Sequence, residues 1–223
     1  MAASADRRNE VLEGFEIAVR AAGFVVLGIC WLAAAAGAMQ GAGTPTGRAG
    51  RLARRLPVHL VYLLGAAPYF AICGLLWRPL PVSLSAAWRV AALALGALLG
   101  AAGGGLYLWG RLSLGDMYNV ASSFGVELYR DHRLVTSGPY RWVRHPMYLG
   151  LLLSGVGGLL VYRRWALVFV LATLPGAAIK ARLEERLLAE EFGALWEEYA
   201  RRVPAWVPQL RHRAGRQAGE EDG

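Results

Sequence analysis

Residues 131–153 read DHRLVTSGPYRWVRHPMYLGLLL and join an arginine-rich polar segment directly to an apolar one. The dipeptide Gly138-Pro139 is typical of a turn. Pro146 suits the first position of a helix, where its missing N–H costs nothing, and it biases His145 toward an extended backbone. We therefore expect a helix to begin at Pro146 and to run on into the apolar segment.

The start of this helix is expected to attract an anion. The free N–H groups and the positive end of the dipole face outward at a helix N-terminus. Arg141, Arg144 and His145 crowd the same point. The pattern fits two interpretations: a basic cap at a membrane surface, and a binding site for a carboxylate.

The composition predicts an all-α fold, a polytopic membrane helix bundle. Hydrophobic residues make up 56% of the 223 residues, in long blocks, and the mean hydropathy of +0.35 is too high for an ordinary soluble domain. The net charge of +8 is typical of membrane anchoring and topology rather than of nucleic-acid binding. Cys30 and Cys73, the only cysteines, lie in apolar blocks without a Cys or His partner, so no metal site is expected.

The apolar blocks predict about five transmembrane helices, near residues 17–39, 57–77, 86–109, 146–162 and 165–179. The first is longer than the apolar part of a signal peptide and follows acidic residues, so we expect it to be retained. The last two blocks are short, and a tilted or re-entrant hairpin also fits them. From 180 to 208, apolar residues recur at helical spacing among glutamates, which predicts a C-terminal amphipathic interfacial helix.

The positive-inside rule predicts an external N-terminus and a cytoplasmic C-terminus. The segments 40–56, 110–145 and 180–223 hold most of the 24 basic residues, and the Arg163-Arg164 turn is an exception. Gly96, Gly100 and Gly104 predict a close helix–helix seam, through which a homo-oligomer is also conceivable. We divide the chain into a three-span region (1–109), a core (110–208) and a disordered tail (209–223).

Two glutamates follow the fifth block within about one helical turn. A carboxylate at such a depth is costly unless it has a cationic partner. Glu184 and Glu185 are therefore expected to meet Arg144 and His145 at one membrane level.

Residues 134–150 (LVTSGPYRWVRHPMYLG) and 184–204 (EERLLAEEFGALWEEYARRVP) resemble the isoprenylcysteine carboxyl methyltransferase family and its bacterial relatives. That wider group also includes phospholipid and small-thiol methyltransferases. The resemblance covers about the C-terminal 75 residues and does not extend to the first three blocks. The matching positions are Arg144, His145, Pro146, Tyr148, Glu184, Glu185, Phe192, Gly193, Tyr199, Arg202, Val203 and Pro204.

The resemblance implies methyl transfer from S-adenosylmethionine to a lipidic or apolar acceptor, with the active site facing the cytoplasm of a bacterial-type inner membrane. The methylated group stays open among carboxylate, amine and thiol. Catalytic roles are implied for Arg144, Glu185 and Arg202. The implied cofactor-binding residues are Leu134, Val135, Gly138, Tyr140, His145, Pro146, Tyr148, Glu184, Glu185 and Tyr199.

The donor's groups match these side chains. The helix N-terminus with Arg144 or His145 suits the donor carboxylate, and Glu184 or Glu185 suits its ammonium. Tyrosine rings suit the sulfonium or the adenine. A carboxylate acceptor would need a cation such as Arg144 or Arg202, whereas an amine acceptor would need a base such as Glu185.

Two other classes of protein remain open. A membrane sterol or enone reductase that uses NADPH has a similar turn, with Asn-Tyr and a following glutamate. Here Met147 precedes Tyr148 and no acid directly follows Gly150. A non-catalytic membrane scaffold would keep the fold and bind no cofactor.

Overall fold

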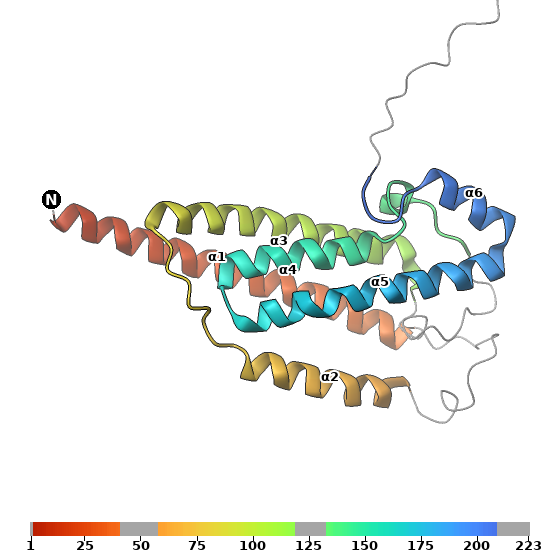
Figure 1. The fold of residues 1–223 in the computed structure, drawn as a ribbon, viewed down its shortest axis with the longest axis horizontal. Helices are drawn as coiled ribbons and strands as arrows, with labels where there is room; N and C mark the ends of the chain where they lie inside the picture. Colours follow the sequence, from red (N-terminus) through yellow and green to blue (C-terminus); the bar gives the residue numbers. More distant parts are fainter. Residues whose placement is uncertain (1, 41–57, 119–132, 209–223) are drawn as a thin grey trace, which may run out of the picture.

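The computed structural model describes residues 2–40, 58–118 and 133–208, and within them the chain is helical without a strand (Figure 1). The predicted all-α fold is confirmed for these residues. Nearly all of the expected cytoplasmic loop 40–56, residues 119–132 of the 110–136 segment and the tail from 209 fall outside the described residues. The elements are α1 (Ala2–Gln40), α2 (Val58–Leu75), α3 (Ala86–Leu114), η1 (Gly115–Met117), η3 (Gly138–Arg141), α4 (Pro146–Tyr162), α5 (Trp165–Phe192) and α6 (Ala194–Arg202).

Helices α3 and α4 form the centre of the bundle and share its most extensive contact. Helix α1 packs mainly on α3, α5 packs on α4, and α2 lies on the outer side of α5 (Figure 1). The short α6 folds back at the end of the bundle where α4 begins. This end therefore gathers α3, α4, α5 and α6 around one point.

Glycines allow α3 and α4 to approach closely. A Cβ at Gly157 would lie 2.6 Å from the Gly96 oxygen and from the Gly100 nitrogen, so a side chain there has no room. A Cβ at Gly104 would instead lie 2.6 Å from Val26 of α1. The predicted glycine seam thus joins helices of one chain at Gly96 and Gly104, and the homo-oligomer stays a prediction.

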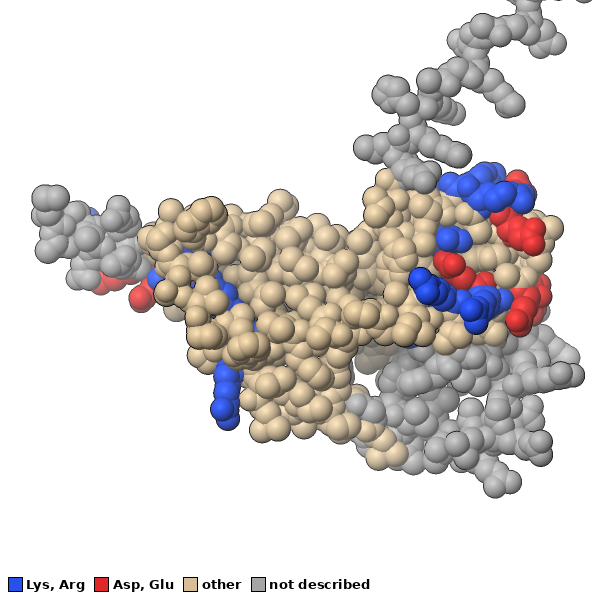
Figure 2. Space-filling model, viewed as in Figure 1, with Lys and Arg blue, Asp and Glu red and all other residues tan. Residues whose placement is uncertain are grey.

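The chain is an integral membrane protein. Three helical stretches are long and apolar enough to cross a bilayer: Glu10–Ala36, Ala86–Leu114 and Trp165–Phe192. On the face that Figure 2 shows, charged residues gather toward the two ends of the bundle and leave an uncharged band between them. The count of five spans stays a prediction, because α4 and the described apolar part of α2 (Ala66–Leu75) are shorter.

The predicted interfacial helix over 180–208 is wrong in its bounds. Helix α5 runs without a break from Trp165 to Phe192, so residues 180–192 continue the last span. Nothing in the sequence at 179–181 interrupts the helix, and Pro175 lies inside it. The break comes at Gly193, whose φ of +48° favours glycine, and only the nine residues of α6 follow. Helices α1 and α3 are also longer than their apolar blocks.

At the other end of the bundle, one glutamate joins three arginines. Glu16 of α1 is 5% exposed, and its Oε1 lies 2.6 Å from Arg20 Nη2. Its Oε2 accepts a hydrogen bond from Arg89 of α3 at 2.5 Å, and Arg163, at the end of α4, donates to its Oε1. This Glu16 cluster connects α1, α3 and α4. It also provides an anionic partner for Arg163, which belongs to the turn that departs from the positive-inside rule.

Candidate active site

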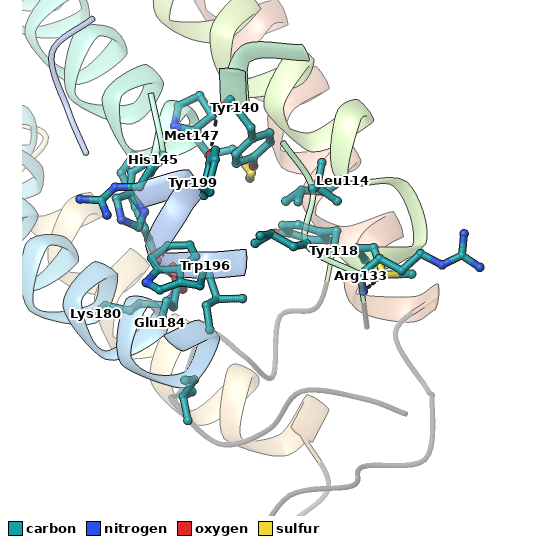
Figure 3. A pocket seen from close by; sticks show the side chains of 18 of the residues that line it. Leu114, Tyr118, Arg133, Tyr140, His145, Met147, Lys180, Glu184, Trp196 and Tyr199 are labelled. Atoms are coloured by element: carbon teal, nitrogen blue, oxygen red, sulfur yellow. Dashed lines mark hydrogen bonds between the residues drawn. The ribbon is translucent and has the colours of Figure 1, made fainter. Parts of the chain in front are cut away.

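A cavity of about 260 Å³ opens where the C-terminal parts of α3 and α5 meet the start of α4 and helix α6 (Figure 3). Its volume is near the lower end of the range of small-molecule sites. One wall is apolar and aromatic, with residues such as Tyr107, Leu114, Leu151 and Leu187. The predicted site residues that line it are Leu134, Val135, Tyr140, Arg144, His145, Pro146, Tyr148, Glu184 and Tyr199.

The helix predicted to start at Pro146 is confirmed as α4. Pro146 occupies the first turn, and His145 before it has a non-helical backbone (φ −122°, ψ 57°). The backbone N–H groups of Arg144 and His145 donate to the carbonyl oxygens of Pro204 and Ala205, at 2.9 and 3.1 Å. These bonds place the end of the second sequence motif directly against the core of the first.

His145, Glu185 and Arg144 form a polar group beside the cavity. His145 Nε2 lies 2.8 Å from Glu185 Oε1, and Arg144 Nε lies 3.3 Å from the same oxygen. The Arg144 Nε–H is buried and poorly aligned with that carboxylate, so it has no hydrogen-bond partner among the described residues. Glu185 itself does not line the cavity but holds two residues that do.

Glu184 has a different set of neighbours from Glu185. The Tyr148 hydroxyl donates a hydrogen bond of 2.8 Å to Glu184 Oε1. One helical turn away, Lys180 Nζ lies 5.6 Å from the centroid of the Tyr148 ring. Glu184 and Lys180 both line the cavity (Figure 3). Adjacent glutamates on α5 therefore face two separate polar groups of α4.

Helix α6 closes the cavity with aromatic side chains. Trp196 and Tyr199 are buried with Val203 in a small apolar cluster, and the Tyr199 hydroxyl donates to the Tyr140 carbonyl oxygen at 2.7 Å. Burial raises the pKa of Tyr199 to about 12 and also raises the pKa of Tyr140. Both hydroxyls thus stay neutral at physiological pH, and Tyr199 acts as a hydrogen-bond donor.

Besides Glu185, two predicted site residues lie away from the cavity lining, Gly138 and Arg202. Gly138 has a φ of +60°, and a Cβ there would collide with the Ser113 hydroxyl, so glycine shapes the turn before α4. The Arg202 side chain is 66% exposed and lies 3.1 Å from Glu198. The structure does not bring Arg202 together with Arg144 and Glu185.

Several lining residues escaped the sequence interpretation. Lys180 is the only lysine and precedes Glu184 by four residues, a spacing that places both on one helix face. Trp206 packs on His145 with ring centroids 5.2 Å apart, beside the cavity. Tyr107 and Tyr118 come from outside the two motifs, so no local pattern marked them.

Part of the chain that forms this arrangement is similar to a known protein family. The family model described as phospholipid methyltransferase matches residues 91–194. The protein-S-isoprenylcysteine O-methyltransferase of Schizosaccharomyces pombe is 33% identical over 83 residues, which cover 36% of this chain and 35% of the relative. Isoenzyme B of Arabidopsis thaliana is 39% identical over 79 residues, covering 34% and 40%.

A bacterial relative matches over a longer stretch. Methanethiol S-methyltransferase 2 of Bradyrhizobium diazoefficiens is 31% identical over 150 residues, covering 60% of this chain and 53% of the relative. The chain thus spans about a third to a half of the length of these curated relatives. Residues 91–194, which hold α4 and both glutamates of α5, are thus similar to the phospholipid methyltransferase family, and the relatives are methyltransferases of isoprenylcysteine and of methanethiol.

Proposed function

We propose that the protein is an integral membrane methyltransferase that uses S-adenosylmethionine and acts on a lipidic or otherwise apolar acceptor. One observation carries the proposal: the two motifs meet around a cavity lined by Arg144, His145, Tyr148 and Glu184, and Glu185 contacts His145 and Arg144 beside it. The names of the relatives, an isoprenylcysteine O-methyltransferase and a methanethiol S-methyltransferase, support the same reaction class.

The residues around the cavity fit the donor's groups. Glu184 offers a carboxylate to the donor's ammonium. The buried Arg144 Nε–H lacks a hydrogen-bond partner in the described chain, and the first turn of α4 has amides without intrahelical acceptors. Trp196 and Tyr199 offer aromatic surfaces to the adenine or the sulfonium. When bound, S-adenosylmethionine supplies a methyl group activated by a positively charged sulfur.

The chain's own residues align the reactants and exclude water. Glu185 orients the His145 ring through the 2.8 Å contact and keeps the Arg144 guanidinium near the cavity. Leu114, Leu151 and Leu187 surround the reacting groups with apolar surface, which desolvates a nucleophile and strengthens electrostatic contacts. Arg144 would hold a carboxylate acceptor, and Glu185 would take the proton of an amine acceptor through His145. Arg202, exposed and paired with Glu198, stays outside the proposed site.

The proposed topology has five spans, α1 to α5, with α6 along the cytoplasmic interface of a bacterial-type inner membrane. The positive-inside rule assigns the basic segments 40–56 and 110–145 to the cytoplasm, and Arg133 and Arg144 of the second segment line the cavity. Five spans place the two ends of the chain on opposite sides of the membrane, so a cytoplasmic C-terminus gives an external N-terminus.

Isothermal titration of the purified protein tests the donor. We expect S-adenosylmethionine to bind and NADPH not to bind. Binding of NADPH alone would favour the reductase, and binding of neither would favour a scaffold. The same titrations on a His145→Ala variant check that the signal comes from this cavity.

The acceptor is tested with membranes that contain the protein. They are incubated with methyl-labelled S-adenosylmethionine and a lipid extract, and the labelled product is separated. Release of methanol in base indicates an ester, whereas a base-stable label indicates an amine or a thioether. Membranes without the protein provide the background.

A further inference from the structure

The ammonium of Lys180 forms no ion pair within 4.0 Å among the described residues, although Glu184 acts on it electrostatically from one helical turn away. It lines the cavity one turn of α5 before Glu184, on the side toward the apolar middle of the bundle. Its Nζ lies 5.6 Å from the centroid of the Tyr148 ring. An ammonium at such a depth is costly unless another group or a ligand compensates it.

The other cationic side chains at the cavity are differently placed. Arg144 lies 3.3 Å from Glu185, which also contacts His145. Arg133 is exposed, and its guanidinium points away from the side chains labelled around the cavity (Figure 3). Lys180 is therefore the cavity-lining cation of the described residues that has both access to the hollow and no carboxylate of its own.

Lys180 and Glu184 together present opposite charges on one helix face. Side chains four residues apart lie about 6 Å from each other along a helix. No direct ion pair joins them, and Glu184 uses one carboxylate oxygen for the Tyr148 hydroxyl. The second Glu184 oxygen and the Lys180 ammonium have no hydrogen-bond partner among the described residues, so together they can meet a ligand that carries an ammonium and a carboxylate close together.

We propose that Lys180 and Glu184 form a clamp for the amino-acid end of the methyl donor. The Lys180 ammonium binds the donor carboxylate, and the Glu184 carboxylate binds the donor ammonium. An α-amino acid carries both charges on a single carbon, so it bridges two such side chains. The clamp rests on the proposed function. It assigns to Lys180 the binding of the donor carboxylate, which the sequence pattern suggested for Arg144 or His145.

Removing the carboxylate from the ligand tests whether Lys180 binds it. The full-length protein in detergent is titrated with S-adenosylhomocysteine and with its decarboxylated analogue, which keeps the amine and lacks the carboxylate. We expect the wild type to prefer S-adenosylhomocysteine. We expect Lys180→Met to weaken that ligand by about tenfold to a hundredfold, the loss of one charge-assisted hydrogen bond, and to leave the analogue nearly unchanged.

Two further variants act as controls. Lys180→Arg retains a cation, so it is expected to keep part of the preference for the carboxylate. Arg186→Met removes an exposed cation of the same helix that does not line the cavity, so both affinities are expected to stay at wild-type values. The thermal unfolding midpoint is measured for every variant. If Lys180→Met does not fold, Lys180→Gln is titrated in the same way.

The outcomes separate the clamp from the proposed function. If Lys180→Met lowered the affinities for both ligands equally, or lowered neither, the clamp would be overturned. The enzyme assignment would stay intact. A raised KM for the acceptor with unchanged S-adenosylhomocysteine affinity would move Lys180 to the acceptor and also overturn the clamp. If the wild type bound neither ligand, the proposed function would fail and the clamp with it.

Discussion

The two ends of the bundle both bring glutamate together with basic side chains, and they use the charges differently. In the Glu16 cluster, both oxygens of one carboxylate are engaged by guanidinium groups from α1, α3 and α4. At the cavity, Glu185 contacts His145 and Arg144 just before α4, Glu184 contacts Tyr148 of α4, and Lys180 forms no ion pair within 4.0 Å among the described residues.

The difference separates a structural cluster from a candidate binding site. Charges that neutralise one another across helices tie the helices together, and the Glu16 cluster does not line the cavity at the other end. Charges that face a hollow without a full set of partners are available to a ligand. Breaking one end is therefore expected to change stability, and breaking the other to change binding.

The largest effect is expected from Glu185→Ala, which removes the shared partner of His145 and Arg144. Affinity for S-adenosylmethionine should fall by about a hundredfold or more, because two charged contacts of about 1.5–3 kcal/mol each depend on this carboxylate. Calorimetric titration measures the affinity, and the unfolding midpoint shows that the protein still folds. Glu190→Ala, on an exposed part of the same helix, is the control. If Glu185→Ala bound S-adenosylmethionine with wild-type affinity, the motif would serve only as a basic cap of the helix.

The next effect is expected from Glu16→Gln, at the other end of the bundle. The free energy of unfolding should fall by about 2–3 kcal/mol, less than for a fully buried pair, because the Arg20 and Arg89 side chains are 33% and 37% exposed. The affinity for S-adenosylmethionine should not change. Thermal unfolding and titration measure the two quantities, with the exposed Glu10→Gln as control. A parallel loss of affinity would show that the two ends are coupled.

A smaller effect is expected at the contact between α3 and α4, which connects the two ends. Gly157→Ala should lower the free energy of unfolding by about 1–2 kcal/mol, because its methyl group would meet the α3 backbone at 2.6 Å. Gly100→Ala is the matched comparison, since a Cβ there meets nothing within 4 Å, and it should be neutral or slightly stabilising. Equal effects on the unfolding midpoint would mean that the helices pack differently.

The smallest effect is expected from Arg202→Ala. Its exposed pair with Glu198 contributes at most about 0.5 kcal/mol, as is typical of surface ion pairs. Donor affinity and turnover should both stay close to wild type. The motif alone assigned Arg202 a catalytic role, which predicts a loss of turnover larger than the loss of binding. If a steady-state assay showed such a loss of turnover, Arg202 would have a catalytic role after all.

The sequence by itself determined the class of the fold and the start of its central helix. Long apolar blocks predict membrane helices, and Pro146 after an extended residue predicts the first turn of α4, because both signals depend on neighbouring residues alone. The family motifs also marked most of the residues that line the cavity. Local signals failed at residue 180, where the end of apolarity was taken for the end of a helix that continues to Gly193.

Only the tertiary structure decided which charges meet. Glu185 contacts His145 across 40 residues of chain, and Glu16 contacts Arg163 across 147. Such partners depend on how α1, α3, α4 and α5 pack, and the glycines of α3 and α4 set that packing. Lys180 and Arg202 carry the same charge in the sequence. Their different surroundings follow from the cavity and the surface on which the folded chain places them.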